Sequence, residues 1–158
     1  EYRCPDLPHR PAEAAALLES LVHERNSVET TLVGSSLGGY YATWLAERCG
    51  CRAVLINPAV RPYEGLRKYL GPQQNIYTGK PYEFTEDHLA ELRALEVGAI
   101  TPERYLLLVA TGDEVLDYRD ALARYRGSRQ IVVQGSDHGM SDFDRYLDPV
   151  LAYAGVSA

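Results

Sequence analysis

The 158-residue sequence predicts an α/β fold in which helices cover both faces of a mainly parallel sheet. Two continuous apolar runs, 53–56 and 105–110, are typical of parallel strands that are buried on both faces. Helical segments alternate with the predicted strands in the order β-α-β-α-β-insert-β-α-β-α. A Gly-x-Ser-x-Gly string at 34–38 stands between a β-prone run and a helical stretch. Together these features indicate one α/β domain over residues 1–158.

The first part of the chain contains three predicted strands, at 1–4, 30–33 and 53–56. Pro11 suits the first position of a helix, where its missing N–H is not needed. An apolar stripe at helical spacing runs to about residue 25, and its members are Ala14, Leu17, Leu18 and Leu21. The helix after the glycine-rich turn ends near Gly50, which we predict to be its C-terminal cap.

Residues 57–102 form an insert that is rich in glycine, proline, tyrosine and charge. An ordinary connection between a strand and a helix has only ~2–6 residues, so we expect either a lid over the site or a structural excursion. Inside the insert, Thr85 is placed to cap a helix that runs to Leu95, because acidic residues follow it and favour the first turn.

The last third of the chain completes the predicted sheet. The strand at 105–110 leads into a polar turn at 111–115, and Asp117 is placed to cap the next helix. Residues 130–133 form the last predicted strand. The closing helical region is interrupted at Pro149, which predicts a kink or a fresh helix start.

The composition is that of an ordinary globular protein and argues against several partners. No apolar run approaches the ~20 residues of a membrane helix, and residues 1–5 lack the basic and apolar regions of a signal peptide. The net charge of −6 argues against nucleic acid and anionic membranes. The three cysteines lack a framework spacing, so we expect free thiols in the cytoplasm. Cys49-x-Cys51 has no second pair and is interpreted as helix-end packing, not a metal site.

The string Gly34-x-Ser36-x-Gly38 fits a nucleophile elbow. A serine at a sharp strand-to-helix turn adopts a strained backbone, and glycines on both sides remove Cβ atoms that would clash. The turn presents Ser36 Oγ at the end of the sheet and aims the backbone N–H of Leu37 at the same place, as one donor of an oxyanion hole. The alternative is a plain tight turn between a strand and a helix.

Four polar residues follow predicted strands: Ser36, Asn57, Asp113 and His138. In an open α/β sheet, functional side chains gather at the carboxyl ends of the strands. A neutral imidazole is needed to take the proton of a serine, and a carboxylate is needed to orient that imidazole. The sequence therefore predicts a catalytic triad of Ser36, Asp113 and His138, in the chain order found in α/β-hydrolases.

Other acids compete with Asp113. Glu114 and Asp117 are close by, but Asp113 directly follows the strand and a glycine, whereas Asp117 suits a helix cap. Asp137 is too close in sequence to His138 to be the favoured orienting acid, although it could form the turn of that loop.

The base also has an alternative interpretation, because His138 could be a surface histidine. None of the other three histidines, at positions 9, 23 and 88, follows a predicted strand. We interpret His23 and His88 as helix-surface residues.

The start of the insert could bind substrate. Arg61, with Arg67 and Lys68, forms a positive region that suits an anionic substrate such as an acyl-CoA. Four tyrosines could line an acyl pocket: Tyr63, Tyr69, Tyr77 and Tyr82. For the cations the favoured alternative is that they are solvated, and the tyrosines could equally be half-buried in packing. We assign Arg61, Tyr63 and Asn57 to substrate binding.

These motifs together resemble those of the YqiA-type bacterial esterases, a branch of the α/β-hydrolase superfamily. The matching segments are 34–45, 57–62, 69–71, 77–79, 111–118 and the His138 loop, and the similarity runs from about Pro5 to the end of the chain. The elbow is common to the superfamily, whereas Asn-Pro-Ala-Val-Arg-Pro and Thr-Gly-Asp-Glu-Val-Leu-Asp-Tyr are far more specific. The resemblance implies an α/β-hydrolase-like three-layer sandwich that hydrolyses small carboxylic esters or acyl thioesters with the Ser36–Asp113–His138 triad, and no metal or organic cofactor.

One feature of that family is missing. The resemblance implies a fold that begins with a strand ending in a His-Gly loop. A backbone N–H of that loop is the second donor of the oxyanion hole. No such segment precedes Glu1, and the sequence does not begin with methionine, so we expect that an N-terminal piece has been lost. An intact mass of 17.6 kDa would show instead that the chain starts here. The rival functions are a non-catalytic binding domain of hydrolase shape and another reaction of the fold, such as that of a peptidase, a lipase or a cofactor-free haloperoxidase.

Overall fold

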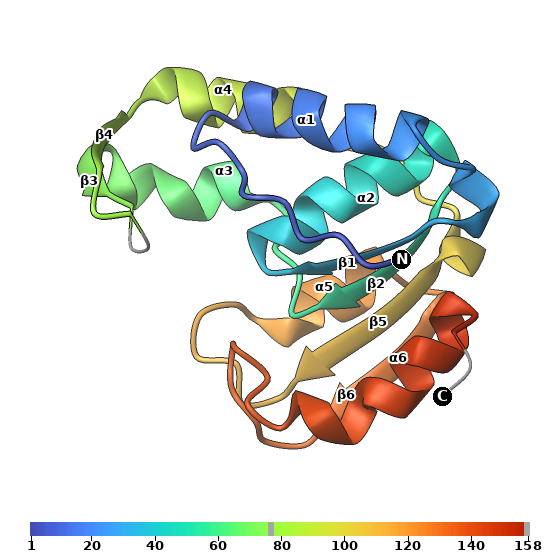
Figure 1. Ribbon diagram of the computed structural model, residues 1–158. Coiled ribbons are helices and arrows are strands. Elements are labelled where there is room, and N and C mark those ends of the chain that lie inside the picture. Colours follow the sequence, from blue (N-terminus) through green and yellow to red (C-terminus); the bar gives the residue numbers. More distant parts are fainter. Residues whose placement is uncertain (76–77, 157–158) are drawn as a thin grey trace.

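Within residues 1–75 and 78–156, which the computed structural model describes, four parallel strands form the central sheet. They are β1 (Thr31–Ser35), β2 (Arg52–Ile56), β5 (Tyr105–Ala110) and β6 (Arg129–Val133). The order in the sheet is β1-β2-β5-β6, and all four arrowheads point the same way (Figure 1). The carboxyl ends of the strands therefore meet at one edge of the sheet, and the predicted α/β class is confirmed.

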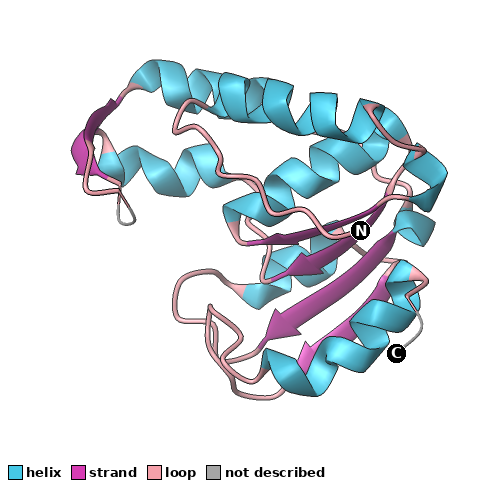
Figure 2. Cartoon of the chain, in the orientation of Figure 1, coloured by secondary structure: helices cyan, strands magenta, loops and turns pink. Residues whose placement is uncertain are grey.

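Helices cover both faces of this sheet (Figure 2). Successive side chains of a strand point to opposite faces, and β2 shows the consequence. Leu55 is fully buried in a cluster with residues of α2 (Leu37–Cys49) and α5 (Tyr118–Arg124). Val54 is fully buried on the opposite face, in a cluster with residues of α6 (Leu147–Ala154). The result is the three-layer sandwich that the sequence predicts.

Further helices lie over α2. The insert contributes α3 (Pro62–Gly65) and α4 (Glu86–Ala94), whose apolar side chains join those of α1 (Pro11–His23) and α2 in one cluster. Between α3 and α4 lie the antiparallel strands β3 (Gly71–Gln74) and β4 (Pro81–Phe84). The insert is thus part of the helical layer, and its closure over the site as a lid stays a prediction. The hairpin strands were not predicted, because four-residue strands containing glycine and proline carry little periodic signal.

Several predicted element ends are confirmed. Gly50 caps α2 in the left-handed conformation, with φ 79°, and the Asp117 side chain accepts the backbone N–H of Arg119 at the start of α5. Pro149 falls in the first turn of α6, which starts afresh after a 3-10 helix. The 3-10 helices of the described residues are η1 (Ser27–Glu29), η2 (Leu66–Tyr69), η3 (Pro102–Arg104) and η4 (Phe143–Tyr146). None of the described helices combines the length and the apolar character needed to cross a membrane.

Two predictions about local structure are wrong. Residues 1–4 do not form a strand, because they pair with none of the described strands, and Arg3 forms an ion pair with Glu24 instead. His88 was expected on a helix surface but is 3% exposed. Its Nδ1 accepts the backbone N–H of Thr85 at 3.1 Å. The ring therefore turns inward and caps the start of α4, and it does not face water.

Candidate active site

Ser36 occupies the sharp turn between β1 and α2. Its backbone has φ 52° and ψ −120°, a combination that is rare for any residue except glycine. The turn is held from outside, because the Ser36 N–H donates to the Ile56 carbonyl and the Ser36 carbonyl accepts the N–H groups of Gly39 and Ala59. The surrounding chain therefore enforces the strained conformation that an elbow requires.

Close contacts explain two of the glycines around Ser36. A Cβ on Gly34 would lie 2.3 Å from the Gly38 carbonyl oxygen, and a Cβ on Gly39 would lie 2.7 Å from Pro58 Cβ. Outside its own helix, a Cβ on Gly38 would meet none of the described atoms within 4 Å. The expectation that glycines on both sides remove clashes is thus correct for Gly34 and wrong for Gly38, whose backbone is the surface that Gly34 approaches.

Gly34→Ala is expected to lower the free energy of unfolding by about 1–3 kcal/mol, because the new methyl group meets a helix backbone that cannot move aside cheaply. Gly38→Ala is the matched control and should be neutral or stabilising, since alanine is the better helix former by about 1 kcal/mol. Urea unfolding of both variants measures the difference. Equal stability of the two would contradict the steric account of the elbow.

The His138 imidazole lies between Ser36 and Asp113. Its Nε2 is 2.9 Å from Ser36 Oγ, and its Nδ1 is 2.9 Å from Asp113 Oδ2. The three residues follow β1, β5 and β6, so the parallel strands bring them together at the edge where they end. The Asp113 side chain is 1% exposed and that of His138 is 20% exposed. In the tautomer with a proton on Nδ1, the ring donates to the carboxylate and leaves Nε2 free to accept the serine proton.

Three donors satisfy the buried Asp113 carboxylate. Oδ1 accepts the backbone N–H groups of Val115 at 2.8 Å and Leu116 at 2.9 Å, in addition to the imidazole contact. A buried carboxylate without such donors would be costly. The neighbouring Glu114 accepts the backbone N–H of His138 at 3.0 Å. Of the acids considered from the sequence, the structure therefore places Asp113 against the ring of His138.

The loop that carries His138 approaches the acid loop closely. A Cβ on Gly112 would lie 2.3 Å from the Ser136 carbonyl oxygen, so the approach depends on glycine. Asp137 accepts hydrogen bonds from the hydroxyl and the N–H of Ser141, and these bonds hold the pKa of Asp137 below its ordinary value. Asp137 thus forms the turn of the loop, as the sequence suggested. The role of Gly112 was missed, since no local pattern reveals which loop passes beside it.

The residues assigned to substrate binding have different surroundings in the structure. Arg61 lines a cavity of about 380 Å³ between α2, α5 and residues 95–98, and Ser36 is not among the lining residues. Tyr63 is buried, and its hydroxyl donates to Glu96 at 2.8 Å. Asn57 is buried and bonds to backbone groups. Substrate contact by these residues stays a prediction, and Tyr77 lies outside the described residues.

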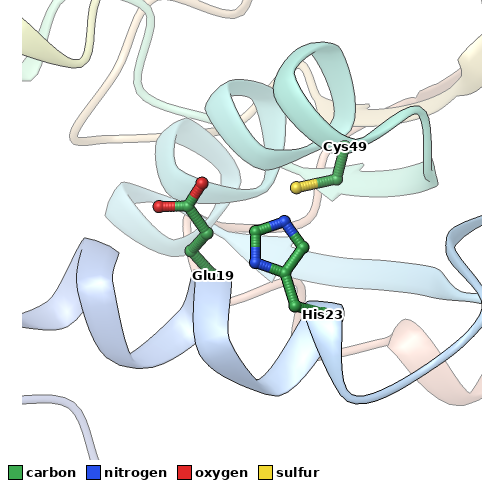
Figure 3. Close-up of side chains that lie close together, drawn as sticks. All are labelled: Glu19, His23 and Cys49. Carbon is green, nitrogen blue, oxygen red and sulfur yellow. The ribbon is translucent and has the colours of Figure 1, made fainter.

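Three potential metal ligands gather at the C-terminal end of α2. Within the described residues, the side chains of Glu19, His23 and Cys49 converge (Figure 3), and their ligand atoms lie within 4.8 Å of one another. Zinc at ~2.0–2.3 Å from each ligand needs ligand atoms roughly 3.5 Å apart. Arg48 forms an ion pair with Glu19, and burial raises the pKa of the Cys49 thiol, which disfavours the thiolate. This group is separate from Ser36, which lies at the opposite end of the helix.

Almost the whole sequence matches one protein family. Residues 1–155 match the sequence profile described as "Uncharacterised protein family (UPF0227)". The chain belongs to the UPF0227 family. The UPF0227 protein YcfP of Salmonella paratyphi A is 25% identical over 149 residues, which are 94% of this chain and 75% of that protein. The resemblance to YqiA-type proteins is confirmed at the level of the family.

Solved structures share the fold of this UPF0227 chain. A protein from Agrobacterium vitis S4 matches with a TM-score of 0.68 and 22% identity, over 91% of this chain and 68% of that one. An alpha/beta superfamily hydrolase from Oenococcus oeni PSU-1 matches with 0.60 and 12%, over 96% and 77%. The esterase domain of a Rhodothermus marinus protein matches with 0.59 and 20%, over 90% and 68%. At these identities the likeness establishes the α/β-hydrolase fold.

Proposed function

We propose that this protein is a serine hydrolase that cleaves carboxylic esters or acyl thioesters through an acyl-enzyme. The observation that carries the proposal is the hydrogen-bonded series from Ser36 Oγ through His138 to Asp113, with both junctions at 2.9 Å. A serine hydroxyl is a weak nucleophile unless a base takes its proton, and here a base lies within reach. The strained backbone of Ser36 supports the same conclusion, since strain of this kind is concentrated at functional sites. The fold shared with an esterase domain is consistent with it.

In the proposed reaction, His138 Nε2 takes the proton of Ser36 as Oγ attacks the carbonyl carbon of the substrate. The oxyanion forms beside the N–H of Leu37, which has no acceptor within α2 because it is the first helical residue. The bond to the alcohol or thiol then breaks, and this leaving group receives the proton from His138. Water then attacks the carbonyl carbon of the acyl-enzyme and gives its proton to His138. The bond to Ser36 Oγ breaks, the carboxylic acid is released, and His138 returns the proton to Oγ, which restores the Ser36 hydroxyl. Asp113 stabilises the imidazolium form of His138 in both acylation and deacylation.

The charges of the insert favour uncharged esters over acyl-CoA as substrates. Arg61 lies 3.6 Å from Glu64, and Arg67 makes two hydrogen bonds of 2.9 Å to Glu86. These acids offset two of the three positive charges at the start of the insert, those of Arg61 and Arg67. A highly charged CoA group therefore gains little attraction here, and we expect a small ester as the better substrate.

Labelling with a fluorophosphonate serine probe tests the proposal. We expect mass spectrometry to locate the adduct on Ser36 and not on the more exposed Ser35, because only Ser36 has a base beside it. Hydrolysis of p-nitrophenyl acetate and of acetyl-CoA then compares ester with thioester. A folded sample that neither labels nor hydrolyses either compound would contradict the hydrolase proposal and favour a binding domain.

A further inference from the structure

Asn57 is the fourth polar residue that follows a strand, and the proposed reaction does not use it. It comes directly after β2, whose neighbours in the sheet are the strands that precede Ser36 and Asp113. Its backbone has φ 42°, a left-handed value that asparagine tolerates better than most residues. Asn57 is only 3% exposed, so its side chain offers almost no surface to a substrate.

The side-chain amide of Asn57 makes three hydrogen bonds to backbone groups. Nδ2 donates to the carbonyl oxygens of Asp137 at 3.0 Å and His138 at 2.9 Å. Oδ1 accepts the N–H of Ala110, the last residue of β5, at 2.8 Å. The partners determine the orientation of the amide, since a carbonyl can only accept and an N–H can only donate. Asn57 thereby ties the His138 loop to the end of β5.

The Asn57 amide holds the backbone of the His138 loop from a different loop than Glu114 and Asp113 do. The backbone N–H of His138 is held by Glu114 and its Nδ1 by Asp113, both from the acid loop, and its Nε2 contacts Ser36 Oγ. The carbonyl of His138 is held by Asn57, which directly follows β2. The backbone N–H of Asn57 in turn donates to the Leu108 carbonyl at 2.9 Å, which anchors it in the sheet.

We propose that Asn57 is a positioning residue that sets the backbone of His138 so that its imidazole spans Ser36 and Asp113. The inference rests on the proposed hydrolase function. A displacement of about 1 Å in a catalytic group can lower a rate about 10²-fold, so the loss of two hydrogen bonds on the loop should be visible in turnover. The burial of the amide and its three hydrogen bonds to backbone groups favour this indirect role over contact with the substrate.

Asn57→Asp is the sharpest variant. It keeps the size of the side chain, the tolerance of positive φ and an acceptor for the Ala110 N–H, but its carboxylate lacks the donors for both loop carbonyls. We expect kcat for p-nitrophenyl acetate and the rate of fluorophosphonate labelling to fall together by about 10–10²-fold, with KM unchanged. Asn26→Asp is the matched control: its Oδ1 accepts the Val28 N–H at 3.2 Å in an exposed turn, and aspartate keeps this bond, so both rates should stay at the wild-type value.

Proton NMR adds a readout that does not depend on turnover. The Nδ1–H of His138 in its hydrogen bond to Asp113 should give a far-downfield resonance in the wild type, which Asn57→Asp broadens or removes. Asn57→Gly, which suits φ 42° and removes the amide altogether, serves as the second variant and should show the same losses.

The outcomes separate the two proposals. Folded Asn57 variants with the wild-type labelling rate and resonance would overturn the positioning role. Failure of both variants to fold cooperatively would also overturn it, because Asn57 would then serve folding and not the site. A wild type that does not label, but whose resonance disappears in Asn57→Asp, would count against the hydrolase function and still support positioning.

Discussion

Replacing Ser36 by alanine is expected to lower kcat for p-nitrophenyl acetate about 10⁶-fold and to abolish fluorophosphonate labelling, with the fold intact. Loss of the nucleophile from a comparable triad has an effect of this size. The reason here is geometric, because Ser36 Oγ is the atom that lies 2.9 Å from His138 Nε2. Alanine removes only that oxygen from a part-buried position, so a thermal unfolding curve close to that of the wild type should accompany the loss.

Ser35→Ala is the matched control for this prediction. Ser35 ends β1, is more exposed than Ser36, and should leave turnover and labelling unchanged when replaced. The double variant Ser36→Ala/His138→Ala should be no slower than Ser36→Ala alone, because the residues of a triad act as a unit. Undiminished turnover in Ser36→Ala, or an equal loss in Ser35→Ala, would remove Ser36 from the nucleophile's role.

The Asp113→Asn variant is expected to lower kcat about 10⁴-fold. The N–H groups of Val115 and Leu116 need an acceptor, so the amide oxygen should take the position of Oδ1. The amide NH₂ then faces Nδ1 of His138 and forces that nitrogen to accept. The ring proton moves to Nε2, which can no longer take the proton of Ser36. Initial rates with p-nitrophenyl acetate, together with the loss of the Nδ1–H resonance, measure this effect.

Asp117→Asn separates a catalytic acid from a helix cap. Asp117 accepts the Arg119 N–H at 3.0 Å at the start of α5, and asparagine caps helices about as well as aspartate. We expect its kcat to match the wild type and its stability to change by roughly 0.5 kcal/mol or less. A loss of turnover in Asp117→Asn as large as that in Asp113→Asn would contradict the assignment of the acid.

Local patterns in the sequence predicted most of the fold, because the signals are short-range. The apolar runs at 53–56 and 105–110 indicate buried parallel strands, and these are most of β2 and the whole of β5. The three residues of the proposed triad could be named from the sequence because each follows a strand, and parallel strands end at the same edge. The short hairpin strands at 71–74 and 81–84 were missed because they have no periodic pattern. The inward turn of His88 was missed because histidine is a polar residue type, although the helical spacing places it on one face with Leu89 and Leu92.

Only the tertiary structure revealed what Gly112 and Asn57 do. The Asn57 side chain reaches a carbonyl 80 residues further along the chain, and Gly112 passes against the backbone of Ser136. Such contacts depend on how closely two loops approach, which is set by strand order and by the packing of helices on the sheet. The sequence by itself determined which groups stand at the strand ends; the three-dimensional arrangement determined which of them touch, because a hydrogen bond requires distances that no linear pattern specifies.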